Sequence, residues 1–178
     1  MRNALLIRFK SVWVFMKISV SQSFLRWLFV IHSYFFFVHA NVYVRTPDNN
    51  TKSYLSQEAD FGPTFPLEGL QGYLYLSKPL NGCSPIPPVK PSGFGNNSIY
   101  NQFLLVQRGD CYFDVKVKNA QNAGYNAVIV YNVDSNTLHE MSSSGVPGIQ
   151  IPSTFVGAFT GQHLKNNLAP TRYVSCLR

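Results

Sequence analysis

Few side chains in this sequence have the type and spacing to do chemistry. Only two of its four histidines, His139 and His163, follow residue 40. His139-Glu140 begins the zinc-binding pattern H-E-x-x-H, but Ser143 stands where the second histidine must be, so consecutive helical turns cannot hold a metal there. Residues 142–145 lack the two glycines of a strained nucleophile elbow. We therefore predict no catalytic residue, no metal site and no cofactor.

One tripeptide and one carboxylate pair also need an interpretation. Arg108-Gly109-Asp110 spells an integrin-binding sequence, but it joins a predicted buried strand to a predicted helix and precedes a cysteine, which leaves little freedom for insertion into a receptor. We predict instead that Gly109 permits a tight turn and that Asp110 helps to begin the helix. Asp110 and Asp114 then interact with the helix macrodipole rather than act as an acid and a base.

The elements that position these residues are predicted to be a strand, a helix and a second strand. Residues 102–107 are a short apolar run fit for a central strand. Residues 110–123 repeat apolar side chains at helical spacing, and Gly124 follows where a left-handed cap would end the helix. Residues 126–131 are a second apolar run. This order predicts a right-handed crossover between two parallel strands.

The rest of the sequence completes a single α/β domain. Residues 69–77 alternate between apolar and more polar positions, and this period of two predicts a strand with one buried face. Residues 153–157 predict another strand and 160–168 a short amphipathic helix, whereas 41–68 show no sustained period and indicate an edge strand or two. The stretches 79–98 and 132–152 are rich in turn-forming residues and predict loops.

Charge is concentrated at the N-terminus. The 178 residues carry 15 basic and 8 acidic side chains, a formal net charge of +7. Five of the basic residues and none of the acids lie in residues 1–40, so the remainder has 10 basic and 8 acidic residues, a net charge of +2. The basic excess belongs to a segment that resembles a targeting sequence, and we therefore do not predict a nucleic-acid partner.

Residues 1–40 are predicted to be a secretory signal peptide. The run WLFVIHSYFFFVHA at 27–40 follows Lys17 and Arg26 and ends in a small residue, the order of a signal peptide cleaved after Ala40. Met16 is an alternative start that gives a signal of ordinary length. The apolar run is shorter than the roughly 20 residues that span a bilayer, so membrane attachment is expected only if this segment stays uncleaved or in a longer isoform.

A secretory route places the rest of the chain in an oxidising compartment. Its three cysteines, Cys83, Cys111 and Cys176, then allow one bridge and one leftover thiol. Sequons begin at Asn49 and Asn96, in polar stretches that we expect to be exposed and glycosylated.

Two segments resemble the signature of the protease-associated (PA) domain, VQRGDCYF at 106–113 and KVKNAQNAGYNAVIVYN at 116–132. The residues that carry this resemblance are Arg108, Gly109, Phe113, Lys116, Asn119, Ala120, Gln121 and Gly124. Residues 66–72, 78–86, 151–157 and 161–165 are similar to the lumenal PA domain of Goliath/GRAIL-type transmembrane RING ubiquitin ligases. The resemblance extends from about residue 59 to residue 165.

The resemblance implies a twisted sheet closed toward a barrel, with two or three short helices. It implies a non-catalytic module that binds protein cargo or substrates, but no small-molecule substrate, in the secretory or endosomal/lysosomal lumen or after secretion. It also implies a disulfide between Cys83 and Cys111, which would tie the proline-rich loop to the helix start. The loops at 79–98 and 133–150 would form the contact surface.

The resemblance does not cover the C-terminal residues. We expect the PA domain to occupy 41–165, followed by an unmatched tail at 166–178 in which Cys176 is an unpaired or intermolecular thiol. Ligases of this type continue with a membrane span and a RING domain, which this sequence lacks. The alternative interpretation is therefore a truncated product of a RING-type ubiquitin ligase, with ligase activity only in a fuller gene product.

Overall fold

The computed structural model describes residues 40–45, 50–89, 101–167 and 173–177. The chain divides into the units Met1–Val38 and His39–Arg178, and all described residues belong to the second. Its strands are β1 (Ala40–Arg45), β2 (Thr51–Glu58), β3 (Leu70–Leu76), β4 (Asn101–Gln107), β5 (Ala127–Tyr131), β6 (Ser153–Val156) and β7 (Tyr173–Leu177). The helices are α2 (Phe113–Asn122) and α3 (Ala158–Asn166).

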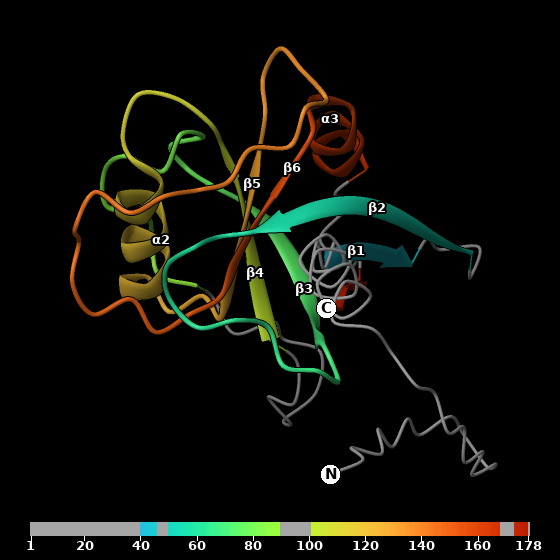
Figure 1. Cartoon of the computed structure of the whole chain (residues 1–178), viewed down its shortest axis with the longest axis horizontal. Coiled ribbons are helices and arrows are strands. Elements are labelled where there is room, and N and C mark those ends of the chain that lie inside the picture. Colours follow the sequence, from blue (N-terminus) through green and yellow to red (C-terminus); the bar gives the residue numbers. More distant parts are fainter. Residues whose placement is uncertain (1–39, 46–49, 90–100, 168–172, 178) are drawn as a thin grey trace, which may run out of the picture. The chain divides into compact units, whose positions relative to one another are not determined.

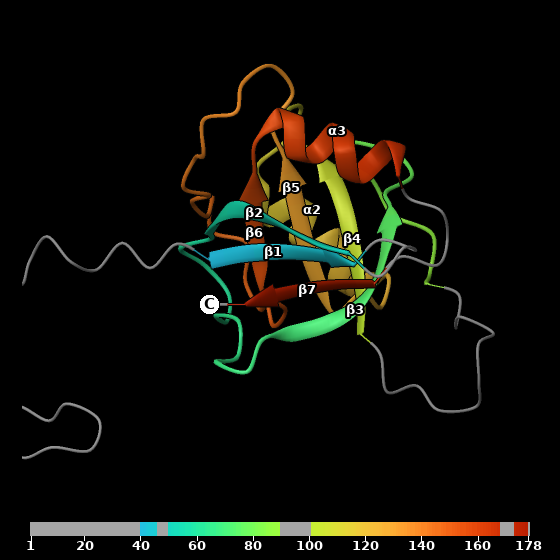
Figure 2. The ribbon, with the colours of Figure 1, turned by 90° about the vertical axis from the view of Figure 1, so that its right-hand side faces the viewer.

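The strands form one closed barrel in the order β1-β2-β6-β5-β4-β3-β7. The pairs β3–β4, β4–β5 and β5–β6 are parallel, whereas β1 and β7 pair antiparallel with their neighbours and close the ring (Figures 1 and 2). Parallel strands place their carboxyl ends at one edge, so the chain leaves β3, β4, β5 and β6 on the same side. We call the segments that follow these strands there, residues 79–82, 108–112 and 133–137 with the first turn of α3, the carboxyl edge.

The sheet buries side chains on both faces along β4. Phe103 and Leu105 join the cluster inside the barrel, together with Val42 from β1. The alternate residues, Leu104 and Val106, join a second cluster that includes side chains of α2. Both faces are therefore apolar, which explains why β4 is a continuous apolar run rather than an alternating one.

The two helices cover different parts of the barrel (Figures 1 and 2). Val117 and Ala120 of α2 are buried against the outer face of the parallel strands. Leu164 of α3 belongs to the inner cluster. Gly161 lets α3 approach β5 closely, because a Cβ placed there would lie 2.3 Å from Cβ of Tyr131.

Most elements match the sequence-based expectations. The barrel and the parallel crossover from β4 through α2 to β5 are confirmed, and two strands precede residue 68 as expected. The expected edge position of these two strands is wrong, because β1 and β2 are each paired on both sides. The prediction that helix α2 includes Asp110 is wrong, because the helix begins at Phe113 and Asp110 has a φ of 67°. Gly124 follows α2 with a φ of 90°, as a left-handed cap requires.

The segment expected to be a tail supplies a strand. β7 pairs with β1 and β3 and closes the barrel. Its Cys176 is a free thiol, but only 2% of the residue is exposed, so the expectation of an intermolecular thiol does not fit its position in the core. Burial strongly raises the pKa of this thiol, which further lowers its reactivity.

Candidate functional site

The loop that follows β3 is covalently attached to the start of α2. Cys83 and Cys111 form a disulfide, with Cα atoms 5.8 Å apart. This is the pair that the resemblance implied. The bridge fixes the first part of the proline-rich loop beside the residues that follow β4, whereas the remainder of that loop, residues 90–100, lies outside the described residues.

Lys116 of α2 binds both the loop that follows β3 and the residues that follow β4. Its side chain is fully buried, and Nζ donates to the carbonyl oxygens of Asn81 and Gly109, both at 2.6 Å. Nζ also lies 3.3 Å from Sγ of Cys83. Burial lowers the pKa of Lys116, and the nearby Asp110 carboxylate opposes this effect. Three acceptors around Nζ match the three N–H donors of an ammonium group.

Asp114 holds a third segment, the loop that leads to β6. Its buried carboxylate accepts hydrogen bonds from the hydroxyls of Ser143 and Ser144 at 2.8 and 2.9 Å, and from the backbone N–H groups of Ser144 and Val146. Burial alone would raise the pKa of Asp114, but these hydrogen bonds outweigh it and lower the pKa to about 2. The predicted role as a macrodipole partner is therefore secondary to this contact.

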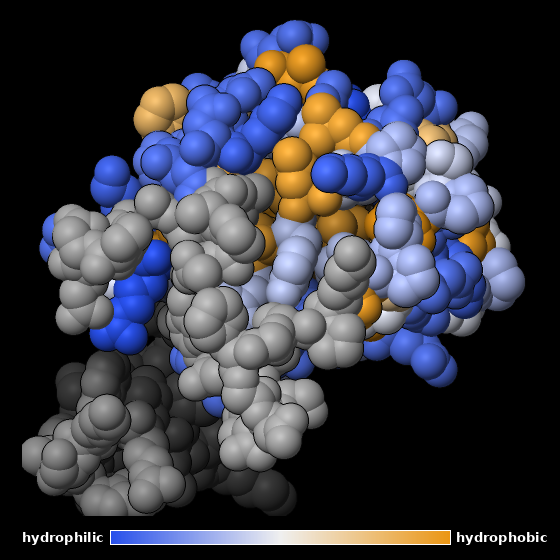
Figure 3. Space-filling view, turned by 180° about the vertical axis from the view of Figure 1, so that it is seen from behind, coloured by the Kyte–Doolittle hydropathy of each residue, from blue (hydrophilic) through white to orange (hydrophobic). Residues whose placement is uncertain are grey.

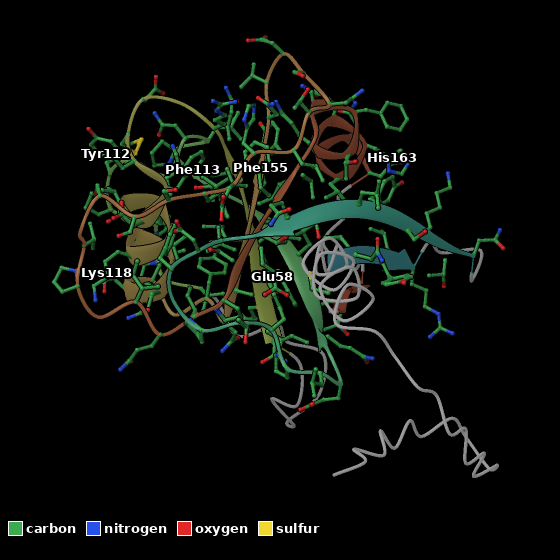
Figure 4. The ribbon with its side chains drawn as sticks, viewed as in Figure 1. Glu58, Tyr112, Phe113, Lys118, Phe155 and His163 are labelled. Carbon is green, nitrogen blue, oxygen red and sulfur yellow. A yellow bond between two sulfur atoms is a disulfide. The ribbon has the colours of Figure 1, made fainter. Side chains whose placement is uncertain are left out.

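Three further polar side chains of α2 bind backbone groups of the flanking loops. Asn119 donates to the carbonyl of Gly82 at 2.9 Å, and Lys118 and Gln121 donate to the carbonyl of Gly148 at 2.9 and 3.0 Å. Lys118 lies on the outer side of α2 (Figure 4). The exposed side of the helix is thus largely a support for loop backbone.

The Arg-Gly-Asp tripeptide does not present free charged side chains. Arg108 donates to Oδ1 of Asn132 at 3.3 Å, and Asp110 accepts from Nδ2 of Asn81 at 2.8 Å. Gly109 has a φ of 108°, so it forms the tight turn that its residue type predicted. Asp110 acts as a partner of the β3 loop and not as the beginning of the helix.

The loop after β5 is attached to the start of α3. Ala158 donates its backbone N–H to the carbonyl of Ser135 at 2.9 Å, and Phe159 donates to Oδ1 of Asn136 at 2.7 Å. These contacts satisfy N–H groups at the helix start, where the N-cap residue Gly157 has no side chain to do so. The protruding residues 133–137 therefore have a fixed position relative to α3.

Three exposed apolar side chains lie on separate segments of the carboxyl edge. Five large hydrophobic residues are exposed in the described part of the chain, namely Leu55, Leu67, Tyr112, Val133 and Phe159. Three of them lie at this edge: Tyr112 is 69% exposed, Val133 41% and Phe159 66%. Figure 4 shows Tyr112 directed outward before α2, whereas the adjacent Phe113 turns toward Phe155, with ring centroids 6.0 Å apart.

Apolar surface also occurs elsewhere. The face seen from behind has an apolar area near its centre, bordered by hydrophilic residues (Figure 3). The distinguishing property of the carboxyl edge is therefore the combination of exposed apolar side chains with loops held by side chains of α2, by a disulfide and by α3.

Several residues in this arrangement were not recognised from the sequence. The hydroxyl of Tyr54 forms a 2.9 Å hydrogen bond with His163, as donor or as acceptor. The ring of Phe159 stacks on His163, which lies on α3 (Figure 4). Burial raises the pKa of Tyr54. The other candidate histidine, His139, packs edge-on against the ring of Phe155. Phe159 and His163 lie four residues apart on α3, a spacing that brings side chains together, whereas Tyr54 comes from a distant part of the sequence and no local pattern indicated its contact.

The predicted glycosylation sites, Asn49 and Asn96, lie outside the described residues. Among the residues that are described, no group of three potential ligands is placed to bind a metal. Neither described helix is long and apolar enough to cross a membrane.

Comparison with known proteins agrees with this architecture. The chain is similar to the E3 ubiquitin-protein ligase RNF13 of Homo sapiens, with 42% identity over 134 residues that cover 72% of this chain and 34% of the relative. It is 37% identical to the E3 ubiquitin-protein ligase Godzilla of Drosophila melanogaster, over 71% of this chain and 23% of the relative. The chain thus spans about a third or less of the length of these relatives.

A third relative carries its domains in its name. It is the receptor homology region, transmembrane domain- and RING domain-containing protein 1 of Oryza sativa subsp. japonica, 40% identical over 66% of this chain and 21% of the relative. Among solved structures, the fold is similar to an aminopeptidase from Aneurinibacillus sp. strain AM-1, with a TM-score of 0.57 and 17% identity over 79% of this chain and 30% of that one. The fold is also similar to a zinc aminopeptidase from Bacillus subtilis, with a TM-score of 0.53 and 21% identity over 78% of this chain and 30% of that chain.

The family itself is identified by the sequence. The PA domain family matches residues 70–164, which extend from β3 into α3 and include the disulfide, Lys116 and Asp114. Both structures of similar fold are consistent with this match. The chain belongs to the PA domain family.

Proposed function

We propose that this chain is a non-catalytic protein-binding module and that its contact surface is the carboxyl edge. The observation that carries this proposal is the exposure of Tyr112, Val133 and Phe159 on three segments whose backbones are held in place. Aromatic side chains are enriched at protein interfaces because they bury a large area and lose little conformational entropy. Held loops favour binding further, because less backbone entropy is lost on association.

The partner is proposed to be a protein and not a nucleic acid or a small-molecule substrate. The carboxyl edge carries two exposed acids, Asp110 and Asp134, and one base, Arg108, which donates to Asn132, so it offers no basic patch for a phosphate backbone. Residues 133–137 protrude beside α3 (Figure 1). Protein partners fit such a surface better than small ligands, which bind in concave pockets.

Binding is tested by comparing surface variants of the full chain. Immobilised parent, Tyr112→Ser and Phe159→Ser chains would each be incubated with lumenal extract of secretory-pathway membranes, and bound proteins would be quantified by mass spectrometry. Leu67→Ser is the matched control, because Leu67 is 82% exposed and lies away from the carboxyl edge. We expect partners retained by the parent and the control to fall at least tenfold with the edge variants. Equal capture by all four chains would exclude the carboxyl edge as the contact surface.

We also propose that the module acts in the lumen of the secretory or endosomal pathway, or after secretion. Cleavage after Ala40 would leave Asn41–Arg45 as a paired strand, and the boundary between the two structural units at Val38 lies beside this site. The disulfide fits an oxidising compartment. Immunoblots of medium and membranes, N-terminal sequencing and glycosidase treatment test this. An intact N-terminus in the membrane fraction would indicate an uncleaved anchor instead.

A second candidate function follows from the length of the relatives. We propose that the chain corresponds to the PA-containing part of a RING-type ubiquitin ligase and competes with such ligases for cargo. Its support is the 42% identity to a ligase of which this chain covers 34%. Sequencing of full-length transcripts tests it: an in-frame membrane span and RING domain beyond the codon for Arg178 in some transcripts supports the proposal. A stop codon at that point in all of them removes the ligase part of it.

A further inference from the structure

The disulfide at the carboxyl edge is chemically asymmetric. Nζ of Lys116 lies 3.3 Å from Sγ of Cys83. No corresponding cation contacts Sγ of Cys111 among the contacts of the described residues. Both cysteines are partly exposed, and Cys111 lies between the exposed residues Asp110 and Tyr112.

The surroundings of Lys116 fix its amino group beside the sulfur. The carbonyl oxygens of Asn81 and Gly109 accept two of its N–H groups at 2.6 Å, and the third faces Cys83. Burial lowers the pKa of Lys116, whereas the Asp110 carboxylate opposes this effect and favours the ammonium form. A fixed ammonium at this distance stabilises a thiolate, and a stabilised thiolate is the better leaving group in thiol–disulfide exchange.

We propose that the Cys83–Cys111 bridge is a thiol-exchange site at which an incoming thiolate attacks Cys111 and Cys83 leaves as a thiolate beside Lys116. A bond forms between the incoming sulfur and Sγ of Cys111 while the bond between Cys83 and Cys111 breaks. The electron pair of the broken bond remains on Sγ of Cys83. The reductant is a small monothiol, whose second equivalent would release Cys111 as a thiol and leave as an oxidised dimer.

Two backbone carbonyl dipoles oppose a negative charge on Sγ of Cys83, but their effect is weaker than that of the Lys116 ammonium. Sγ of Cys83 lies 3.6 and 3.7 Å from the carbonyl oxygens of Asn81 and Gly109, which disfavour a negative charge. Both oxygens already accept short hydrogen bonds from Lys116, so much of their negative potential is directed at Nζ. A full charge at 3.3 Å therefore dominates over two partial charges at longer distance.

Opening the bridge would leave the two cysteines close together. The loop after β3 keeps the hydrogen bonds from Gln107 N–H to Leu80 at 2.9 Å and from Asn119 to Gly82 at 2.9 Å, and Lys116 continues to bind both segments. The reaction is therefore reversible, because the Cys83 thiolate remains within reach of a mixed disulfide on Cys111.

The first test uses the oxidised full chain and glutathione as the probe. The protein would be exposed briefly to glutathione at pH 7, quenched with acid, and its free thiols blocked with a maleimide. Trypsin cleaves after Arg108 and Lys116, so Cys111 is recovered in a peptide separate from Cys83. We expect glutathione on Cys111 and maleimide on Cys83 with at least a tenfold preference. An equal or reversed distribution would overturn the proposal.

A second measurement separates the effect of charge from steric access. Chains reduced with a phosphine would be alkylated with iodoacetamide across pH, with buried Cys176 remaining unlabelled as a reporter of the folded state. We expect Cys83 to have an apparent pKa at least about one unit below the ordinary value near 8.5, and below that of Cys111. Lys116→Arg should retain this difference and Lys116→Met should remove it. A Cys83 thiol that titrates at or above Cys111 in the folded parent would contradict the proposal.

Discussion

Replacing Asp114 by asparagine tests whether the buried carboxylate holds the loop before β6. The carboxylate accepts hydrogen bonds from Ser143, Ser144 and Val146, and the residue is fully buried. An asparagine in its place offers one acceptor and directs an NH₂ group at donors. We expect Asp114→Asn to lower the free energy of unfolding at pH 7 by roughly 2–4 kcal/mol.

The dependence of this effect on pH follows from the pKa. Folding lowers the pKa of Asp114 from 3.8 to about 2. A difference of about 1.8 units corresponds to about 2.4 kcal/mol of stability. Because the folded pKa is the lower one, this stability is present above about pH 4 and is lost as the pH falls through about 2.

Urea denaturation followed by circular dichroism between pH 2 and pH 7 measures both quantities. The parent should lose about 2 kcal/mol more than Asp114→Asn between pH 4 and pH 2, so the two stability curves should converge in acid. Asp134→Asn is the matched control, because Asp134 is an exposed acid on the loop after β5. Parallel curves for parent and Asp114→Asn over the whole range would refute the assignment of a lowered pKa to Asp114.

Three further substitutions probe the scaffold, each by thermal or chemical denaturation. Gly161→Ala should destabilise by roughly 1–3 kcal/mol, because the new Cβ would lie 2.3 Å from Tyr131; an unchanged melting temperature would mean that α3 does not pack closely on β5. Cys111→Ser should lose about 3.5 kcal/mol under non-reducing conditions, since the bridge to Cys83 spans 28 residues, and a reductant should not destabilise it further. Gly124→Ala should cost about 1 kcal/mol because φ is 90° there, whereas glycine-to-alanine stabilisation would contradict the left-handed cap.

The sequence was informative where local periodicity and burial coincide. β4 and β5 are buried on both faces and therefore appear as apolar runs, and α2 between them has apolar residues at helical spacing. β7 was not predicted, because its position depends on pairing with β1 and β3, at least 100 residues earlier in the chain. A short strand whose partners are remote carries little local signal.

The contacts of the polar α2 residues with the neighbouring loops were also not predicted, although the sequence contained one sign that Lys116 is buried. Lys116 lies three residues after Phe113 and four before Ala120, so it shares the apolar stripe of α2 and had to be buried. Its acceptors could not be inferred, because they are backbone carbonyls in two other segments. For Asp114, position near a helix start suggested the macrodipole, and only the tertiary contact with residues 143–146 reveals the stronger interaction.

Side chains of α2 bind the neighbouring loops mainly through backbone atoms, and this has a consequence for recognition. Lys116 and Asn119 donate to carbonyl groups of residues 81, 82 and 109, and Asp114 accepts from the N–H groups of Ser144 and Val146. Backbone groups are present whatever residue occupies the position, so substitutions at exposed loop positions leave these contacts intact, except at Ser143 and Ser144, whose hydroxyls also bind Asp114. Such a helix can hold loops of different sequence in one conformation, which allows the contact surface to change without loss of the barrel.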